Sequence, residues 1–277
     1  MSMRNTITKI IRSAGRAGAM CLSPAIRRGG LYPAVAAAEA YFAFLVGKGA
    51  GSGWDLAAEV KAATGAIHRR DAVIFDIGAN DGRWSAAVAN AIGSSTLRFF
   101  LFECSPQVLP YLSKHIHGIP NPLVTSAAIS DHDGTIEIYA PSRGSGLGSV
   151  YERRDVGIAK EDYKVVSVKA ITIDAFVRQH SIRRIDLLKM DIEGHELAAL
   201  HGAEDSLRDH TIQTLTFEFG SANINSRTFF RDYFDYLSKF GYKLHRIGPG
   251  GALFPVAVYY EDLEYFRGAT NYIAFRS

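Results

Sequence analysis

The sequence predicts an α/β fold in which a mostly parallel, twisted sheet carries helices on both faces. From Val73 onward, short apolar runs of strand length alternate with helical segments, which is typical of a doubly wound sheet. The first run, Val73–Ile77, is continuously apolar apart from Asp76 and predicts a buried parallel strand. A glycine turn and an alanine-rich helix, Arg83–Ile92, follow it. Together they predict a nucleotide-type cradle at the carboxyl edge of the sheet.

The turn after this strand supplies the first candidate binding residues. Gly78 and Gly82 lack side chains where the backbone must turn sharply and where a ligand must approach. The spacing G-x-x-x-G is neither the dinucleotide pattern G-x-G-x-x-G nor a phosphate loop with G-K-[ST]. Asp76, Ala79 and Asn80 complete the set of candidates, although such a turn can also do no more than connect a strand to a helix.

The second predicted strand, Leu97–Phe102, ends at Glu103, 21 residues after Gly82. An acidic residue at this place is where a ribose diol is usually held, because one carboxylate can accept hydrogen bonds from both hydroxyls. The alternative is an exposed glutamate that merely closes the strand.

Four motifs then occur in order: FDIGANDGRWS, FECSP, AISDHDGTIEIY and KMDIEGHELAALHGA. With these motifs the chain resembles the FkbM family of methyltransferases from about Val73 to Phe275. The resemblance implies a Rossmann-like class I methyltransferase fold with an antiparallel last strand, and S-adenosyl-L-methionine as the cofactor. Cys104 stands where the family commonly has proline, which changes the stiffness of the turn but not the assignment of Glu103.

The remaining elements follow in order from their apolar patterns. Helices are expected at Pro106–His117, Thr172–His180, Glu196–Leu207 and Thr228–Phe240, and further strands at Pro122–Ile129, Thr135–Tyr139, Lys164–Lys169, Ile185–Met190, Ile212–Phe219, Tyr242–Ile247 and Tyr272–Phe275. The Gly- and Ser-rich segment Pro141–Val150 is expected to be a mobile loop over the active site.

The third strand exit is where an adenine would lie in this architecture. Ile129 and its neighbours Ala128 and Ser130 are therefore candidate contacts. Asp131 can accept a hydrogen bond from the adenine amino group, and a structural Asx turn is the alternative.

The candidate catalytic residues follow the fourth and fifth strands, whose carboxyl ends face the ligand crevice. A hydroxyl acceptor needs a base that takes its proton during attack on a methyl group. The set is Lys189, Asp191, Glu193, His195 and Glu218. Asp191 could instead cap the next helix, and His195 could be solvated. Asp191 and Glu218 alone do not specify a divalent cation, so no metal is expected.

The N-terminal part is expected to be separate from the catalytic domain. Residues 1–66 predict a basic helical extension and linker, and residues 67–277 the methyltransferase domain. Within the extension, Leu31–Val46 and Asp55–Ala66 predict helices, and the glycine-rich run Gly47–Gly53 predicts a flexible linker. The aromatic residues of the first helix are expected to cover the domain or a second subunit, which would make a homo-oligomer.

Charge and composition limit the partners. A net charge of +3 is too small to indicate nucleic acid, and two cysteines give no disulfide framework, so a reducing cytoplasm fits best. No apolar run approaches the roughly 20 residues that span a bilayer. The first 28 residues carry six basic residues and no acid. They can lie peripherally on the anionic inner face of a membrane, or form a solvated arm.

The resemblance implies O-methylation, often of a sugar hydroxyl in polysaccharides, glycolipids or glycosylated natural products. The expected partner is a small-molecule or glycan acceptor. Two alternatives are a nicotinamide dinucleotide-dependent oxidoreductase and a non-catalytic binding module. The glycine spacing counts against the first, and the acidic pair after the fourth strand counts against the second.

Overall fold

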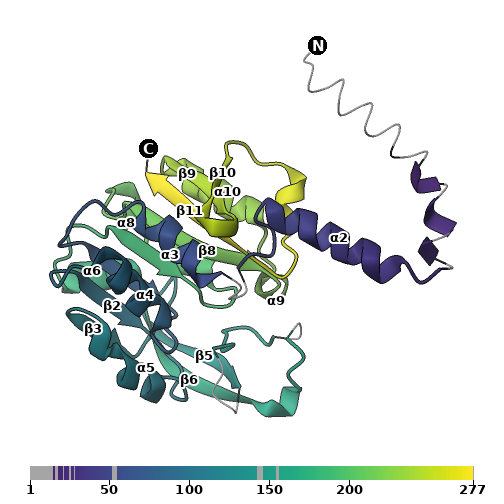
Figure 1. Ribbon diagram of the computed structural model, residues 1–277. Helices are drawn as coiled ribbons and strands as arrows, with labels where there is room; N and C mark the ends of the chain where they lie inside the picture. Colours follow the sequence, from purple (N-terminus) through teal and green to yellow (C-terminus); the bar gives the residue numbers. More distant parts are fainter. Residues whose placement is uncertain are drawn as a thin grey trace. The chain divides into compact units, whose positions relative to one another are not determined.

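The computed structural model describes residues 15, 18–20, 22–24, 26–27, 29–51, 55–141, 146–153 and 156–276. The chain forms two compact units, residues 1–43 and residues 44–277. The boundary predicted between residues 66 and 67 lies inside the second unit, which contains the whole sheet (Figure 1).

The second unit is built on an eight-stranded sheet of order β10-β9-β11-β8-β7-β1-β2-β3. The five strands from β8 to β3 are parallel, and β11 pairs antiparallel with β8, which confirms the expected antiparallel last strand. The strands are β1 Val73–Ile77, β2 Arg98–Phe102, β3 Pro122–Thr125, β7 Leu187–Met190, β8 Thr214–Gly220, β9 Tyr242–Ile247, β10 Leu253–Val256 and β11 Ala269–Arg276.

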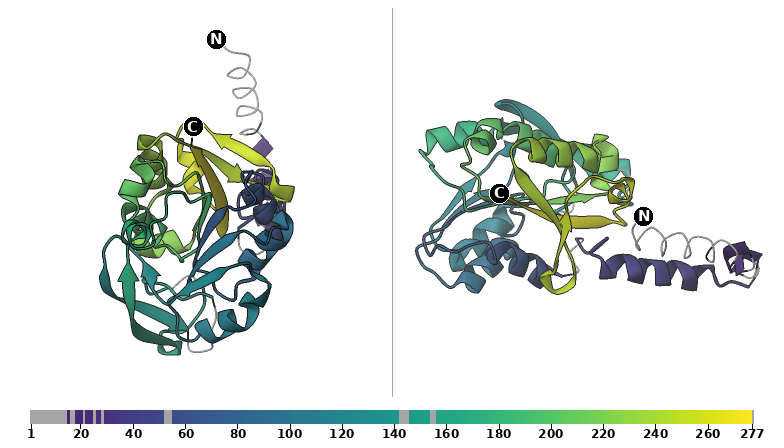
Figure 2. Two further views of the ribbon diagram at one scale, coloured as in Figure 1. Left: turned by 90° about the vertical axis from the view of Figure 1, so that its left-hand side faces the viewer. Right: turned by 90° about the horizontal axis from the view of Figure 1, so that it is seen from above.

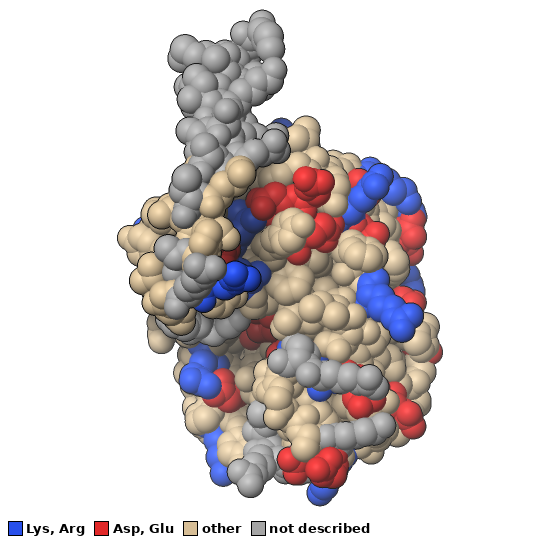
Figure 3. Space-filling view, turned by 90° about the vertical axis from the view of Figure 1, so that its right-hand side faces the viewer, with Lys and Arg blue, Asp and Glu red and all other residues tan. Residues whose placement is uncertain are grey.

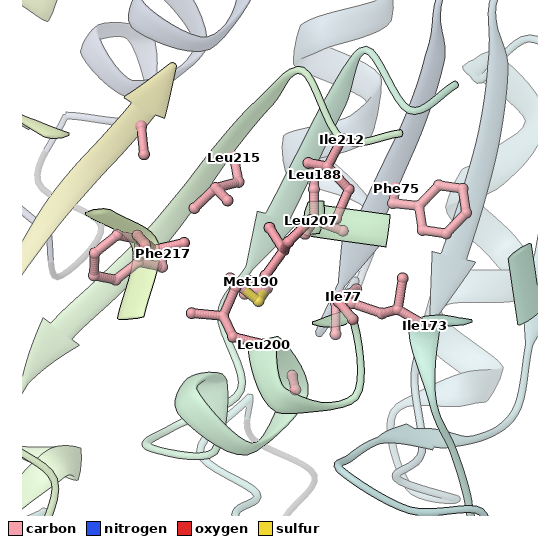
Figure 4. Packing of buried hydrophobic residues seen from close by; sticks show 14 of the residues in the cluster. Phe75, Ile77, Ile173, Leu188, Met190, Leu200, Leu207, Ile212, Leu215 and Phe217 are labelled. Carbon is pink, nitrogen blue, oxygen red and sulfur yellow. The ribbon is translucent and has the colours of Figure 1, made fainter. Parts of the chain in front are cut away.

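Helices cover both faces of this sheet, as predicted (Figure 2). They are α3 Leu56–Thr64, α4 Arg83–Ile92, α5 Leu109–His115, α6 Ile173–Gln179, α7 Glu196–His201, α8 Glu204–Arg208, α9 Ala222–Ser226 and α10 Phe230–Lys239. In the larger core cluster, Phe75 and Met190 of the sheet pack with Leu200 and Leu207 of α7 and α8 (Figure 4). On the other face, α3, α4 and α5 pack on the side of Ile74.

The predicted third strand, Pro122–Ile129, is wrong as a single strand. β3 ends at Thr125, and Ala128–Ile129 forms β4 in a separate three-stranded sheet of order β4-β6-β5. The other two strands are β5 Gly134–Pro141 and β6 Tyr163–Ile171. The chain turns away after β3 because Ala128 buries itself against residues of β5 and β6.

The predicted helix Glu196–Leu207 is divided into α7 and α8 at Gly202. A Cβ at Gly202 would lie 2.0 Å from the carbonyl oxygen of Ser130, so α7 ends close against the end of β4. The carboxylate of Asp174 starts α8 by accepting hydrogen bonds from the backbone N–H groups of Asp205 and Ser206, both at 2.9 Å. Thr172 caps α6, its Oγ1 accepting a hydrogen bond from Ala175 N at 3.1 Å.

The glycine-rich run is not a free linker where the structure describes it. Gly51 N donates to Ala269 O at 2.8 Å, and Gly49 N donates to Thr270 Oγ1 at 3.0 Å, so residues 49–51 bond to β11. Gly53 lies outside the described residues. These bonds bring the chain to α3 at a fixed place beside the sheet.

The helix before this run, α2 Tyr32–Leu45, contains no buried side chain. Across the described residues, we find no helix that has both the length and the apolar character needed to cross a bilayer. Charged side chains on the face in Figure 3 form several small mixed groups of acids and bases.

Candidate active site

A cavity of about 320 Å³ opens where β1 and β2 end, a volume suited to part of a cofactor. Its walls are largely apolar and include Phe102, Ile129 and Ile138. Residues 146–150 close one side, so the described part of the predicted covering loop does line the site. We call this space the donor cavity.

Glu103 is the charged end of the donor cavity. Its carboxylate oxygens accept from Asn80 N at 3.0 Å and from Ser105 N at 2.8 Å. Burial raises the pKa of Glu103, and these N–H donors partly offset that effect. Each oxygen has further lone-pair capacity, so the carboxylate can still accept hydrogen bonds from a diol. The buried acceptor beside apolar walls fits the ribose and adenine of S-adenosyl-L-methionine.

Gly78 is needed for the fold as well as for the approach of a ligand. Its φ is +79°, and a Cβ there would lie only 1.9 Å from the carbonyl oxygen of Asp191. The ends of β1 and β7 therefore touch at this point. Gly82 does not line the donor cavity, and a Cβ there would meet Leu112 of α5 at 3.0 Å.

The structure separates the two residues predicted at the adenine end. Ile129 lines the donor cavity. Asp131 does not, because its half-exposed carboxylate bonds to His132 Nδ1 at 2.6 Å and to Ser130 Oγ at 3.1 Å. Asp131 is thus held in a local polar cluster with Ser130 and His132.

His195 lines the donor cavity and is buried. Ser130 Oγ lies 3.0 Å from its Nε2, and Tyr151 Oη lies 3.2 Å from its Nδ1. Burial lowers the pKa of His195 to about 4, so the ring is neutral at pH 7. The neutral ring thus contacts one hydroxyl group through each of its nitrogens, and these contacts fix its orientation in the wall of the donor cavity.

A second cavity, of about 490 Å³, adjoins the first. Gly78, Asn80, Leu147, Asp191 and Glu193 line both spaces, so they form a shared wall. We call the second space the acceptor cavity. Of the predicted residues, Ala79, Lys189 and Glu218 line it alone.

Lys189 organises the base of the acceptor cavity. Its ammonium lies 3.4 Å from Asp76 Oδ1 and 3.3 Å from Asp191 Oδ2. Asp76 is fully buried and lines neither cavity. Its carboxylate also accepts a hydrogen bond from Ser85 Oγ at 2.6 Å, so it binds the Lys189 ammonium from within the protein core. Burial alone would lower the pKa of Lys189, but the nearby carboxylates of Asp76, Asp191 and Glu59 raise it. Lys189 therefore stays charged.

Glu193 is positioned by a strained turn after β7. Its φ is +55°, and Gly194 follows at +99°, where an added Cβ would lie 2.9 Å from the carbonyl oxygen of Ala222. Arg153 forms an ion pair with the Glu193 carboxylate. Burial and the charge of Asp191 raise the pKa of Glu193 to about 7 despite this pair. Glu193 can therefore gain or lose a proton near neutral pH.

Glu218 contributes another carboxyl from β8. Burial, together with Asp191 and Glu193, raises its pKa well above the ordinary value. Within the described residues, no group of His, Cys, Asp and Glu side chains is arranged to hold a metal ion. The acceptor cavity thus offers hydrogen-bonding and proton-accepting groups.

Sequence reasoning missed most of the other residues that line the acceptor cavity, among them Glu59, Trp84, Arg153 and Asn271. Trp84 stands inside the first motif and could have been singled out by its place after Gly82. The other three come from segments with no strand-end signal. Only the folded contacts bring them to the site.

The sequence model of the methyltransferase FkbM domain matches residues 76–244. A relative, the 2-O-methyltransferase NoeI of Sinorhizobium fredii (strain NBRC 101917 / NGR234), is 26% identical over 154 residues. The match covers 51% of this chain and 61% of that relative.

Two solved structures are similar to this chain to different degrees. Methyltransferase FkbM from Methylobacillus flagellatus KT has a TM-score of 0.50 at 15% identity, with 77% of this chain and 48% of that chain covered. An S-adenosylmethionine-dependent O-methyltransferase from Thermotoga maritima has a TM-score of 0.44 at 11% identity, with 81% and 65% covered. The match thus spans about half the length of the first structure.

Proposed function

Because this chain belongs to the FkbM family of methyltransferases, whose cofactor is S-adenosyl-L-methionine, we propose that it methylates a hydroxyl group of a sugar or glycosylated acceptor. The shared wall between the donor and acceptor cavities carries this proposal. A methyl group bound on one side of Asp191 and Glu193 would face an acceptor on the other. The name of the relative NoeI, a 2-O-methyltransferase, supports oxygen as the acceptor atom.

The cofactor supplies an electrophilic methyl group on a positively charged sulfur, so the protein's contribution is positioning and charge. In this proposal Glu103 binds the ribose hydroxyls, and Ile129 contacts the adenine. The apolar walls exclude water from the donor cavity. Asn80 supports Glu103 through its backbone N–H group.

Glu193 is the proposed proton acceptor. Its pKa near 7 leaves a large fraction ionised at neutral pH, and it remains basic enough to take a hydroxyl proton during attack. Both acids are ion-paired, Asp191 to Lys189 and Glu193 to Arg153. Because burial raises the pKa of Glu193 to about 7, we assign proton acceptance to Glu193 and orientation of the acceptor hydroxyl to Asp191. His195 lines only the donor cavity, which makes it a weaker candidate for the base.

The test is methyl transfer from labelled S-adenosyl-L-methionine to a panel of glycans and glycolipids from cells that lack this gene. The proposal expects the label in one product as an acid-stable O-methyl ether. Label on nitrogen or carbon would contradict O-methylation. The absence of cofactor binding by calorimetry would contradict the assignment of the donor cavity itself.

A further inference from the structure

The far wall of the acceptor cavity comes from outside the matched domain. Glu59 of α3 precedes residue 76, and Asn271 of β11 follows residue 244, yet both line this cavity. Asn271 Nδ2 donates to Glu59 Oε2 at 3.3 Å. Asn271 is also the register partner of Glu218 on β8, so these three side chains come from adjoining elements of one wall.

Most charges around the acceptor cavity are balanced locally. Lys189 pairs with Asp191, Arg153 with Glu193, and Arg83 with Asp81 at 2.6 Å. Glu59 and Glu218 form no ion pair with any basic side chain in the parts of the chain that the structure describes. They are the two acidic groups left to act on a ligand.

Polar atoms without partners mark the same cavity. Thr216, only 2% exposed, lies two residues before Glu218 on β8, and its Oγ1 has no hydrogen-bond partner. The buried Trp84 indole N–H also makes no hydrogen bond of good geometry, although it lies near enough to Glu59 to lower that carboxyl's pKa. A buried polar group of this kind usually finds its partner in water or a ligand. Hydroxyl groups both donate and accept, so they suit this mixed set.

We propose that Glu59 and Glu218, bridged by Asn271, determine acceptor specificity by binding hydroxyl groups and rejecting acceptors that carry a negative charge. The proposal rests on the proposed function, since it assigns this cavity to the acceptor. Like-charge contact in a partly buried site is costly, whereas hydroxyl donors satisfy both carboxyls.

The electrostatics of the two carboxyls agree with this role. Burial raises the pKa of Glu59 to about 7, although Lys189 opposes the rise, and burial also raises the pKa of Glu218 well above its ordinary value. Asp76 and Asp191 also face Glu59, and Asp191, Glu193 and Glu196 face Glu218. These carboxyls already suppress one another's ionisation, so a ligand anion would be repelled by those that are ionised, and the repulsion should grow as the pH rises.

The experiment uses the full chain saturated with S-adenosylhomocysteine, whose binding is first measured by calorimetry. Saturation-transfer difference NMR then compares methyl glucoside, its amino analogue methyl glucosaminide and its acidic analogue methyl glucuronoside as probes. The proposal expects binding of the first two and at least about tenfold weaker binding of the third. Glu59→Gln and Glu218→Gln should each reduce that discrimination several-fold.

The matched control is Glu137→Gln, which removes the same charge from an exposed position on β5 and should leave discrimination unchanged. Thermal melting and S-adenosylhomocysteine affinity establish that each variant is folded. Equal binding of all three probes, no binding of any of them, or unchanged discrimination in both folded cavity variants would overturn the proposal. A wild-type protein that fails to bind S-adenosylhomocysteine would instead contradict the proposed function.

Discussion

The ammonium of Lys189 lies 3.3 Å from a carboxylate oxygen of Asp191, while the neighbouring carboxylate of Glu193 is paired with Arg153 from another segment. The two acids that follow β7 are therefore held by different cations. Asp191 is 42% exposed and its partner Lys189 is kept charged, whereas burial raises the pKa of Glu193 to about 7. The pair consequently divides into an orienting group and a proton acceptor.

Glu193→Gln is expected to slow methyl transfer by about 10²–10⁴, because the variant cannot accept the hydroxyl proton. Cofactor affinity should change much less, because Glu103, the proposed ligand of the cofactor's ribose, follows β2 and not β7. Single-turnover rates and calorimetry measure the two effects separately.

The wild-type rate should also rise with pH around a midpoint near 7, as Glu193 loses its proton among Asp191, Arg153 and Glu196. His195→Gln is the control, because that residue touches only the donor cavity. A Glu193→Gln enzyme with normal turnover, beside an inactive His195 variant, would assign the base to the histidine.

Glu196→Gln is expected to change how stability depends on pH. Glu196 is 1% exposed, and burial raises its pKa from 4.5 to about 7. The folded protein therefore keeps a proton that the unfolded chain loses between pH 4.5 and 7, so this group lowers the free energy of unfolding as pH rises through that range. Relative to the variant, the wild type should lose up to about 3 kcal/mol between pH 5 and pH 8. Urea denaturation at both pH values measures the free energy of unfolding of the two proteins. The same difference between wild type and variant at pH 5 and at pH 8 would contradict the burial argument.

Glu103→Ala is expected to weaken binding of S-adenosyl-L-methionine by roughly 1.5–3 kcal/mol, the scale of a hydrogen bond to a charged group. Glu103→Gln should lose less, because it keeps one acceptor oxygen. Calorimetric titration gives both affinities. Wild-type affinity in the two variants would refute the ribose assignment.

Gly78→Ala is expected to destabilise the fold strongly, since its Cβ would meet the Asp191 carbonyl at 1.9 Å. Gly157→Ala is a matched control with a similar φ, +68°, and no atom within 4 Å of the added Cβ. The control should cost only about 1–2 kcal/mol for the left-handed backbone. Denaturant titration compares the two, and equal costs would mean that the β1 and β7 ends can separate freely.

Removing residues 1–43 should leave cofactor affinity unchanged, because the second compact unit begins at Phe44. The six basic residues and the exposed Tyr41 and Phe42 lead us to predict that the full chain binds vesicles containing anionic lipid and the shortened chain does not. Flotation of both proteins with anionic and neutral vesicles tests it. Equal flotation of the two chains would count against peripheral membrane contact.

The parallel strands, and the place of Glu103 at the end of the second one, could be predicted because strand, glycine turn and strand-end acid are local patterns. Val73–Ile77 was predicted with the observed bounds, and the structure brings Glu103 to the cavity beside that strand. The division of the third strand could not be seen, because Ala128 is as apolar in one sheet as in the other. Glu59 and Asn271 lie 212 residues apart, and no periodicity connects them. Their pairing follows only from the packing of α3 beside β11.

The central claim is that this protein places a methyl group on an oxygen of a glycosylated acceptor. The most direct measurement is mass spectrometry of glycans and glycolipids from a deletion strain complemented with the wild-type gene or with Glu193→Gln. The account predicts that one product lacks a single O-methyl group in the deletion strain, regains it with the wild type, and does not regain it with the variant. Identical O-methylation in all three strains, or a methyl group found on nitrogen or carbon, would contradict it.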